Sequence, residues 1–138
     1  MGKSAMAGFS SFSRMNALIV EDQAFIRTVV SRILKQLEFN QIFEADEGTG
    51  GLTLALERKP DVIICDIEMA PMDGLTFLQQ LRQKEELGRR TPVIFLTNHA
   101  QKDMVLKARD LGVNAFIAKP VTVVGLREKL AVLLSNRR

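Results

Sequence analysis

The sequence predicts an α/β domain, an open parallel β-sheet with helices on both of its faces. From Asn16 onward, short apolar runs alternate with segments whose apolar residues recur at helical spacing, and this pair of patterns occurs five times. The third run, Val62 to Asp66, is apolar enough to be covered on both faces, as the strands of a parallel sheet are. We therefore expect five strand–helix units in one domain.

The first two units occupy residues 16–58. Asn16 to Val20 is predicted to form a buried strand, which ends at Glu21-Asp22. The helix that follows has one apolar stripe, made of Ile26, Val29, Val30, Ile33, Leu34 and Leu37. Residues 41–45 suit a second strand, and residues 52–58 suit a helix that ends before Pro60.

The last three units begin with the strand at residues 62–66. Asp73 is a good N-cap for a helix with leucines at positions 75, 78 and 81. Residues 93–96 and Ala115–Ala118 are expected to form the fourth and fifth strands. A shorter helical segment lies between these strands and contains Met104, Val105 and Ala108, and the final helix begins near residue 121.

Length and composition exclude several classes of protein. A chain of 138 residues suits one domain, and a net charge of +3 without clustered Lys/Arg does not indicate nucleic-acid binding. No apolar run is long enough to span a bilayer. The single cysteine, Cys65, fits a reducing compartment, so we expect a cytoplasmic protein. Residues 1–14 lack a secretory signal and are expected to be a flexible tail or expression remnant before a domain at 15–138.

Polar side chains stand where the predicted strands end. Glu21 and Asp22 follow the first strand, Asp66 closes the third, Thr97 closes the fourth and Lys119 closes the fifth. Because ligands of such sheets bind beyond the carboxyl ends of the strands, we expect these five groups to meet at one rim.

The chemistry of this rim indicates phosphoryl transfer. Two like charges about 4 Å apart repel by roughly 4 kcal/mol at an effective dielectric near 20, so clustered carboxylates require cations. Lys119 supplies one positive charge, and a ligand set made only of oxygens suits Mg²⁺. A carboxylate nucleophile, Mg²⁺, a lysine and the hydroxyl of Thr97 together suit transfer of a phosphoryl group onto Asp66.

From residue 16 to residue 135 the chain resembles the response-regulator receiver domains of two-component signalling. The matching residues are Glu21-Asp22, the segment DIEMAPMDG that begins at Asp66, Thr97, Phe116 and Lys119-Pro120. The resemblance implies a flavodoxin-like (βα)5 fold with strand order 2-1-3-4-5. It also implies a cis peptide bond between Lys119 and Pro120.

The resemblance implies how the acidic residues act. Asp66 matches the phosphoacceptor and Asp22 matches the direct ligand of Mg²⁺. Glu21 matches a residue that acts on the metal through water, and the backbone carbonyl of Glu68 matches a third metal contact.

The resemblance also implies phosphoryl-binding and switching roles. Thr97 and Lys119 match the residues that bind the phosphoryl group, and Thr97 with Phe116 matches the pair that switches conformation. Glu68 and His99 stand at positions that tune hydrolysis of the phosphoaspartate.

The implied partners are proteins. The resemblance implies a sensor histidine kinase or a phosphotransfer histidine protein as donor, in bacterial signalling. A downstream protein would read the surface of helix four, strand five and helix five. No small-molecule turnover, nucleic-acid partner or membrane partner is expected.

The chain departs from the receiver pattern in three places. Ala70 separates Met69 from Pro71, Asn98 replaces a residue that is commonly small, and Phe116 lacks the hydroxyl of tyrosine. We expect the shifted proline to change the backbone locally and Asn98 to narrow access to the phosphoryl site. Phe116 can switch between rotamers but cannot form a hydrogen bond as it does so.

Other functions remain open alternatives. The main one is a receiver-shaped adaptor that binds its partner without phosphorylation. A phosphatase of the haloacid-dehalogenase type would show D-x-D, whereas this chain has Asp66-Ile67-Glu68. In a flavodoxin-like cofactor binder, Glu21-Asp22 would repel the cofactor phosphate. The glycine-rich residues 48–51 suit a flexible helix start better than a phosphate cradle.

Overall fold

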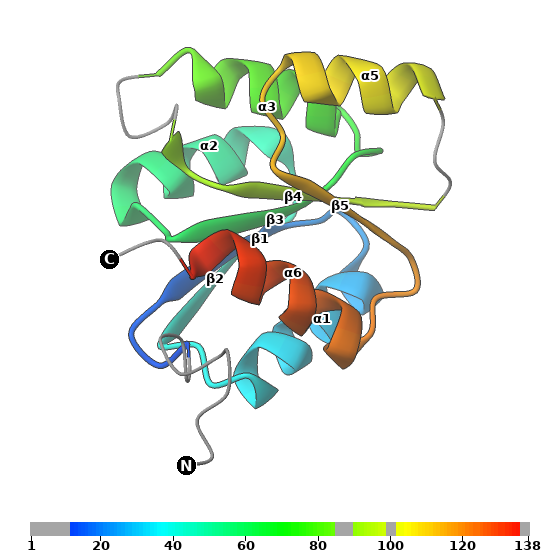
Figure 1. Ribbon diagram of the computed structural model, residues 1–138. Coiled ribbons are helices and arrows are strands. Elements are labelled where there is room, and N and C mark those ends of the chain that lie inside the picture. The colour runs from blue at the N-terminus through cyan, green and yellow to red at the C-terminus, as the bar shows by residue number, and fades with distance from the viewer. Residues whose placement is uncertain (1–11, 85–89, 99–101, 136–138) are drawn as a thin grey trace.

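The computed structural model describes residues 12–84, 90–98 and 102–135, which form a five-stranded parallel sheet with helices on both faces (Figure 1). The strand order is β2-β1-β3-β4-β5, as predicted. The strands are β1 (Asn16–Val20), β2 (Gln41–Ala45), β3 (Val62–Asp66), β4 (Val93–Thr97) and β5 (Ala115–Ala118). The helices are α1 (Ala24–Gln36), α2 (Gly48–Arg58), α3 (Gly74–Arg82), α5 (Lys102–Asp110) and α6 (Val123–Leu134).

The core consists of two apolar layers, one on each face of the sheet. Helices α1 and α6 cover one face, and α2, α3 and α5 cover the other (Figure 1). Successive side chains of a strand point to opposite faces, so Ile64 packs in the α1/α6 layer and Cys65 packs in the other layer. Every residue of β3 is buried, which confirms that this strand is covered on both faces.

Helix α2 begins at Gly48, earlier than the start predicted at residue 52. The carboxylate of Glu47 caps this helix by accepting hydrogen bonds from the N–H groups of Thr49 at 2.8 Å and Gly50 at 3.0 Å. Glycine has a low helix propensity, which is why the sequence pattern misses the first turn. The capped amides confirm a helix start here rather than a phosphate cradle.

Close packing explains one of these glycines. A Cβ atom on Gly51 would lie 2.8 Å from Cγ2 of Val20 in β1 and 3.1 Å from Cε1 of Phe77 in α3. Both neighbours are fully buried and cannot move aside easily. The absence of a side chain therefore lets α2 approach β1 and α3.

The other boundaries agree closely with the sequence pattern. Asp73 caps α3 by accepting the N–H of Thr76 at 2.8 Å, as predicted. Helix α6 begins at Val123 instead of near residue 121, because Thr122 is its N-cap and accepts the N–H of Gly125 at 3.0 Å.

The first described residue already belongs to the packed domain. The ring of Phe12 is 4% exposed and stacks on Phe39 with 4.8 Å between ring centroids. Ordered packing thus begins before residue 15, within the segment for which a tail was expected. In the part of the chain that the structure describes, no helix combines the length and apolarity needed to cross a membrane.

Two neighbouring glycines of α2 should respond oppositely to alanine. We expect Gly51→Ala to lower the free energy of unfolding by about 1–3 kcal/mol, because its Cβ overpacks the core. At Gly50 the Cβ would meet only ordinary contacts, at 3.7 Å and 3.8 Å, so Gly50→Ala should be neutral or stabilise by up to about 1 kcal/mol. Urea unfolding measures both, and equal effects would contradict the packing argument.

Candidate functional site

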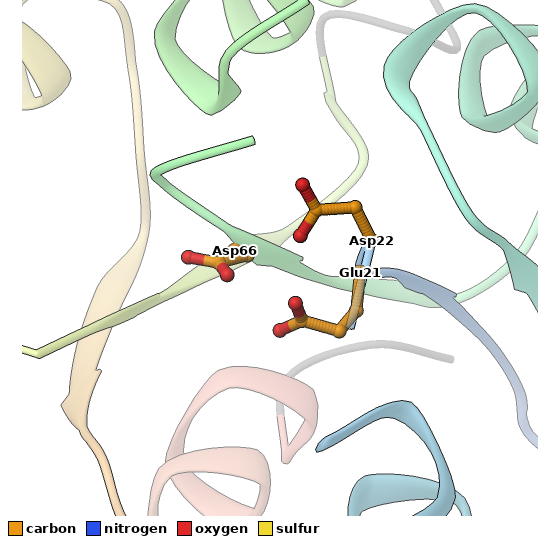
Figure 2. A group of neighbouring side chains, drawn as sticks. All are labelled: Glu21, Asp22 and Asp66. Carbon is orange, nitrogen blue, oxygen red and sulfur yellow. The ribbon is translucent and has the colours of Figure 1, made fainter. Parts of the chain in front are cut away.

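Three carboxylates meet at the carboxyl edge of the sheet. Glu21 and Asp22 follow β1 and Asp66 ends β3, and one oxygen from each lies within 4.8 Å of the others. In Figure 2 the side chains of Glu21 and Asp22 extend from the end of β1 toward Asp66 at the end of β3. Glu21 is 0% exposed and Asp66 is 3% exposed, whereas Asp22 is exposed. The cluster is thus buried on one side and open to solvent on the other.

Lys119 reaches this cluster from the end of β5. Its Nζ donates to Oδ2 of Asp66 at 2.8 Å and lies 3.7 Å from Oε1 of Glu21. The backbone N–H of Lys119 donates to the carbonyl oxygen of Thr97 at 2.8 Å, which holds the end of β5 beside β4. The bond between Lys119 and Pro120 is cis, as the resemblance implies. One ammonium therefore faces two buried carboxylates.

The pKa of Glu21 is raised from 4.5 to about 7 in this environment. Burial is the largest cause, followed by the hydrogen bonding and negative charge of Asp66, while the N–H of Gln23 and the charge of Lys119 act in the opposite direction. Oε2 of Glu21 accepts the N–H of Gln23 at 3.1 Å. Among the described residues, the buried Oε1 of Glu21 has no hydrogen-bond partner.

A divalent cation fits this corner. The donors of Glu21, Asp22 and Asp66 are all oxygens, which suits Mg²⁺. A buried polar atom without a partner costs about 1–3 kcal/mol, so Oε1 of Glu21 is poised for a positive ligand or for a water that such a ligand carries. The chemistry of the donor set therefore matches the predicted metal.

The chain that follows Asp66 folds back over the end of β3. The N–H of Glu68 donates to Oδ1 of Asp66 at 3.0 Å, and the N–H of Ala70 lies 3.4 Å from Oδ2 of Asp22. The side chain of Glu68 is exposed. The bond between Ala70 and Pro71 is cis, in the loop where the proline stands one position later than in the receiver pattern.

Gly74 brings the start of α3 against the backbone of Asp66. A Cβ atom there would lie 2.6 Å from the carbonyl oxygen of Asp66 and 2.7 Å from Cα of Ile67. The N–H of Gly74 donates to the carbonyl oxygen of Ile67 at 2.9 Å. The pair Asp73-Gly74 at a helix start was a possible signal, but the sequence alone gives no reason why the second position must lack a side chain.

The two predicted switch residues lie on neighbouring strands. Thr97 ends β4 and is partly buried, opposite Ala118 of β5. Phe116 is also partly buried, and its ring is tilted by 48° to Phe95 at 6.2 Å between centroids.

The remaining predicted positions give less information. Asn98, next to Thr97, is exposed. His99 lies outside the described residues. No sequence pattern points to Arg27, whose guanidinium donates to the carbonyl oxygen of Glu21 at 2.7 Å.

The raised pKa of Glu21 predicts how stability depends on pH in metal-free buffer. The folded protein holds the proton of Glu21 more tightly than the unfolded chain, so this contribution is present below the ordinary pKa of 4.5 and is lost as pH rises through about 7. Glu21→Gln cannot ionise. Its free energy of unfolding, relative to wild type, should therefore be higher at pH 8 than at pH 5.

Thermal or urea unfolding at these two pH values checks the prediction. Glu57→Gln, on the exposed side of α2, is the matched control and should keep a constant difference from wild type. If the free energy of unfolding of Glu21→Gln relative to wild type did not change with pH, ionisation of the buried Glu21 would not destabilise the folded protein, and the prediction would be wrong.

Comparison with known proteins places the chain in a family. A sequence profile described as "Response regulator receiver domain" matches residues 17–131. Chemotaxis protein CheY-3 of Vibrio cholerae is 36% identical over 116 residues, which cover 84% of this chain and 88% of that protein. Chemotaxis protein CheY of Pseudomonas aeruginosa is 34% identical over 116 residues, covering 84% and 93% respectively.

Solved structures show the same fold. Chemotaxis protein CheY4 of Vibrio cholerae superposes with a TM-score of 0.82 at 26% identity, covering 88% of this chain and 99% of that one. The receiver domain of sensor histidine kinase PA1611 of Pseudomonas aeruginosa, described with a magnesium ion coordinated in its active-site cleft, has a TM-score of 0.77 at 26% identity, covering 88% and 95%. With the matched profile, these likenesses show that the chain belongs to the response-regulator receiver family.

Proposed function

We propose that this receiver domain is a signalling switch in which Asp66 accepts a phosphoryl group in the presence of Mg²⁺. The donor is a phosphohistidine on a sensor histidine kinase or a phosphotransfer protein. The observation that carries the proposal is the environment of Asp66: Lys119 contacts one carboxylate oxygen, Glu68 N–H contacts the other, and the carboxylates beside it suit a cation.

Asp66 is the nucleophile of the transfer. A new bond forms between one of its oxygens and phosphorus, the bond from phosphorus to the imidazole nitrogen breaks, and that nitrogen keeps the electron pair. The residues that would hold Mg²⁺ are Asp22, Asp66 and the carbonyl of Glu68, with Glu21 acting through water. Bound there, the metal neutralises charge on the phosphoryl oxygens.

Lys119 and Thr97 bind the transferred group. Before transfer, the ammonium of Lys119 lies 2.8 Å from Oδ2 of Asp66. Phosphorylation converts the Asp66 carboxylate into an acyl phosphate, and the carboxylate loses its negative charge. The ammonium of Lys119 can then turn to a phosphoryl oxygen. The hydroxyl of Thr97, at the end of the adjacent strand β4, donates to another of these oxygens.

The signal passes from Thr97 to the surface formed by α5, β5 and α6. Helices α5 and α6 are the fourth and fifth helices expected from the sequence. Thr97 moves toward the phosphoryl group, and the partly buried Phe116 turns further inward. Exposed apolar side chains on this surface suit a downstream protein partner; Leu106 of α5 is 57% exposed and Val124 of α6 is 55% exposed.

The lifetime of the phosphorylated state depends on water at the rim. Glu68, which is exposed and stands two residues after Asp66, orders or blocks the attacking water, and His99, two residues after Thr97, shares this tuning role. The domain turns over no small molecule. The unpaired thiol of Cys65 fits a reducing, cytoplasmic setting.

Incubation with a small-molecule phosphodonor and Mg²⁺ tests phosphorylation. Intact mass should show one added phosphoryl group on wild type and none on Asp66→Asn, because the amide is not a nucleophile. Asp46→Asn is the matched control, since Asp46 is an exposed aspartate that follows β2 at the same edge of the sheet. It should be modified like wild type.

Modification of Asp66→Asn to the extent seen in wild type would place the reaction elsewhere. No modification of wild type would contradict the switch and favour an adaptor that acts without phosphorylation.

A further inference from the structure

We infer that Arg27 is a positioning residue for the acidic pair: its guanidinium holds the Glu21–Asp22 peptide so that both carboxylates face Asp66. The inference rests on the proposed function, because the acidic pair matters there as the metal-binding part of the site. Arg27 itself touches neither the phosphoryl group nor the metal in this account.

The side chain of Arg27 reaches from α1 to the residue that follows β1 and to strand β2. Its NH1 donates to the carbonyl oxygen of Glu21 at 2.7 Å, a short hydrogen bond assisted by the positive charge. Its Nε lies 3.4 Å from Oε1 of Glu44 in β2. The side chain of Arg27 is only 22% exposed, so both contacts are partly shielded from water.

Strand β2 anchors the acidic pair through two consecutive residues. Ala45 accepts the backbone N–H of Glu21 at 3.0 Å, and Glu44 orients the guanidinium that binds the carbonyl of Glu21. The backbone of Glu21 is thereby held on its N–H side and on its C=O side. The sheet thus fixes the backbone N–H of Glu21, and Arg27 fixes its backbone C=O.

Fixing the carbonyl of Glu21 also fixes the direction from which Asp22 projects. The peptide unit is planar, so the carbonyl of Glu21 and the N–H of Asp22 rotate together. Asp22 is exposed, and among the described residues its carboxylate is held only by a long contact, 3.4 Å from Oδ2 to the N–H of Ala70. Without Arg27 this peptide can rotate and turn the Asp22 carboxylate away from the cluster.

A purely electrostatic role for Arg27 would have the opposite effect. A positive charge beside the cluster repels Mg²⁺, so its removal would strengthen metal binding. A positioning role predicts that removal weakens metal binding, because partners that orient metal ligands typically contribute about 10–100-fold to affinity. The sign of the change separates the two roles.

Calorimetric titration of the full chain with Mg²⁺ at pH 8 is the test. We expect Arg27→Gln to weaken Mg²⁺ binding on the order of tenfold. Arg27→Lys keeps the charge and a donor nitrogen but loses the planar fork, so its Mg²⁺ affinity should fall between those of wild type and Arg27→Gln. Arg32→Gln removes the same charge from an exposed position of α1 and should bind like wild type.

A second measurement excludes a merely structural role. Urea unfolding in metal-free buffer gives the free energy of unfolding of each variant. If Arg27→Gln lowered only this free energy, and the folded variant bound Mg²⁺ as tightly as wild type or more tightly, the inference would be overturned. If wild type itself took up no Mg²⁺, the proposed function would fail as well, so the two failures are distinguishable.

Discussion

Two buried carboxylates, Glu21 and Asp66, share one lysine ammonium among the residues that the structure describes, and the chemistry of the site follows from that shortage of positive charge. Burial strengthens the interaction between charges and removes the water that would otherwise screen them. Burial, together with Asp66, raises the pKa of Glu21, and within the described part of the chain Oε1 of Glu21 has no hydrogen-bond partner. Asp22 adds a third carboxylate to this cluster on its solvent-exposed side, and a cation can enter from that side.

The fold creates this imbalance by bringing together residues that are distant in sequence. Strand β1 lies between β2 and β3, where the strand order reverses, and ligands of such sheets bind at this point. Asp66 therefore emerges beside the acidic pair, and Lys119 reaches across from β5. Gly74 packs against the backbone of Asp66, and Arg27 binds the backbone carbonyl of Glu21. In the proposed role of Arg27, this contact holds the Glu21–Asp22 backbone in place while the carboxylates repel each other.

Most of the fold could be predicted because strand and helix periods are strong in this chain. The unbroken run at β3 and the apolar stripe of α1 led to the correct elements. The polar residues at the strand ends pointed to Glu21, Asp22, Asp66 and Lys119, which the structure brings close together. The sequence indicates a helix start at residues 48–51 but not the reason for Gly51, which is its contact with Val20 and Phe77. Gly74 and NH1 of Arg27 meet backbone atoms, and Nε of Arg27 meets the side chain of Glu44 on another element; neither kind of contact leaves a pattern in the sequence.

The most direct test of the account is the number of protons released when Mg²⁺ binds to the wild-type chain. Titrations in buffers of different ionisation enthalpy give this number. A cation in the corner stabilises ionised Glu21, so binding near pH 7 should release a fraction of one proton, and binding at pH 9 should release none. Mg²⁺ uptake with the same proton balance at both pH values, or no uptake at all, would contradict the claim that the buried carboxylates are completed by a metal ion.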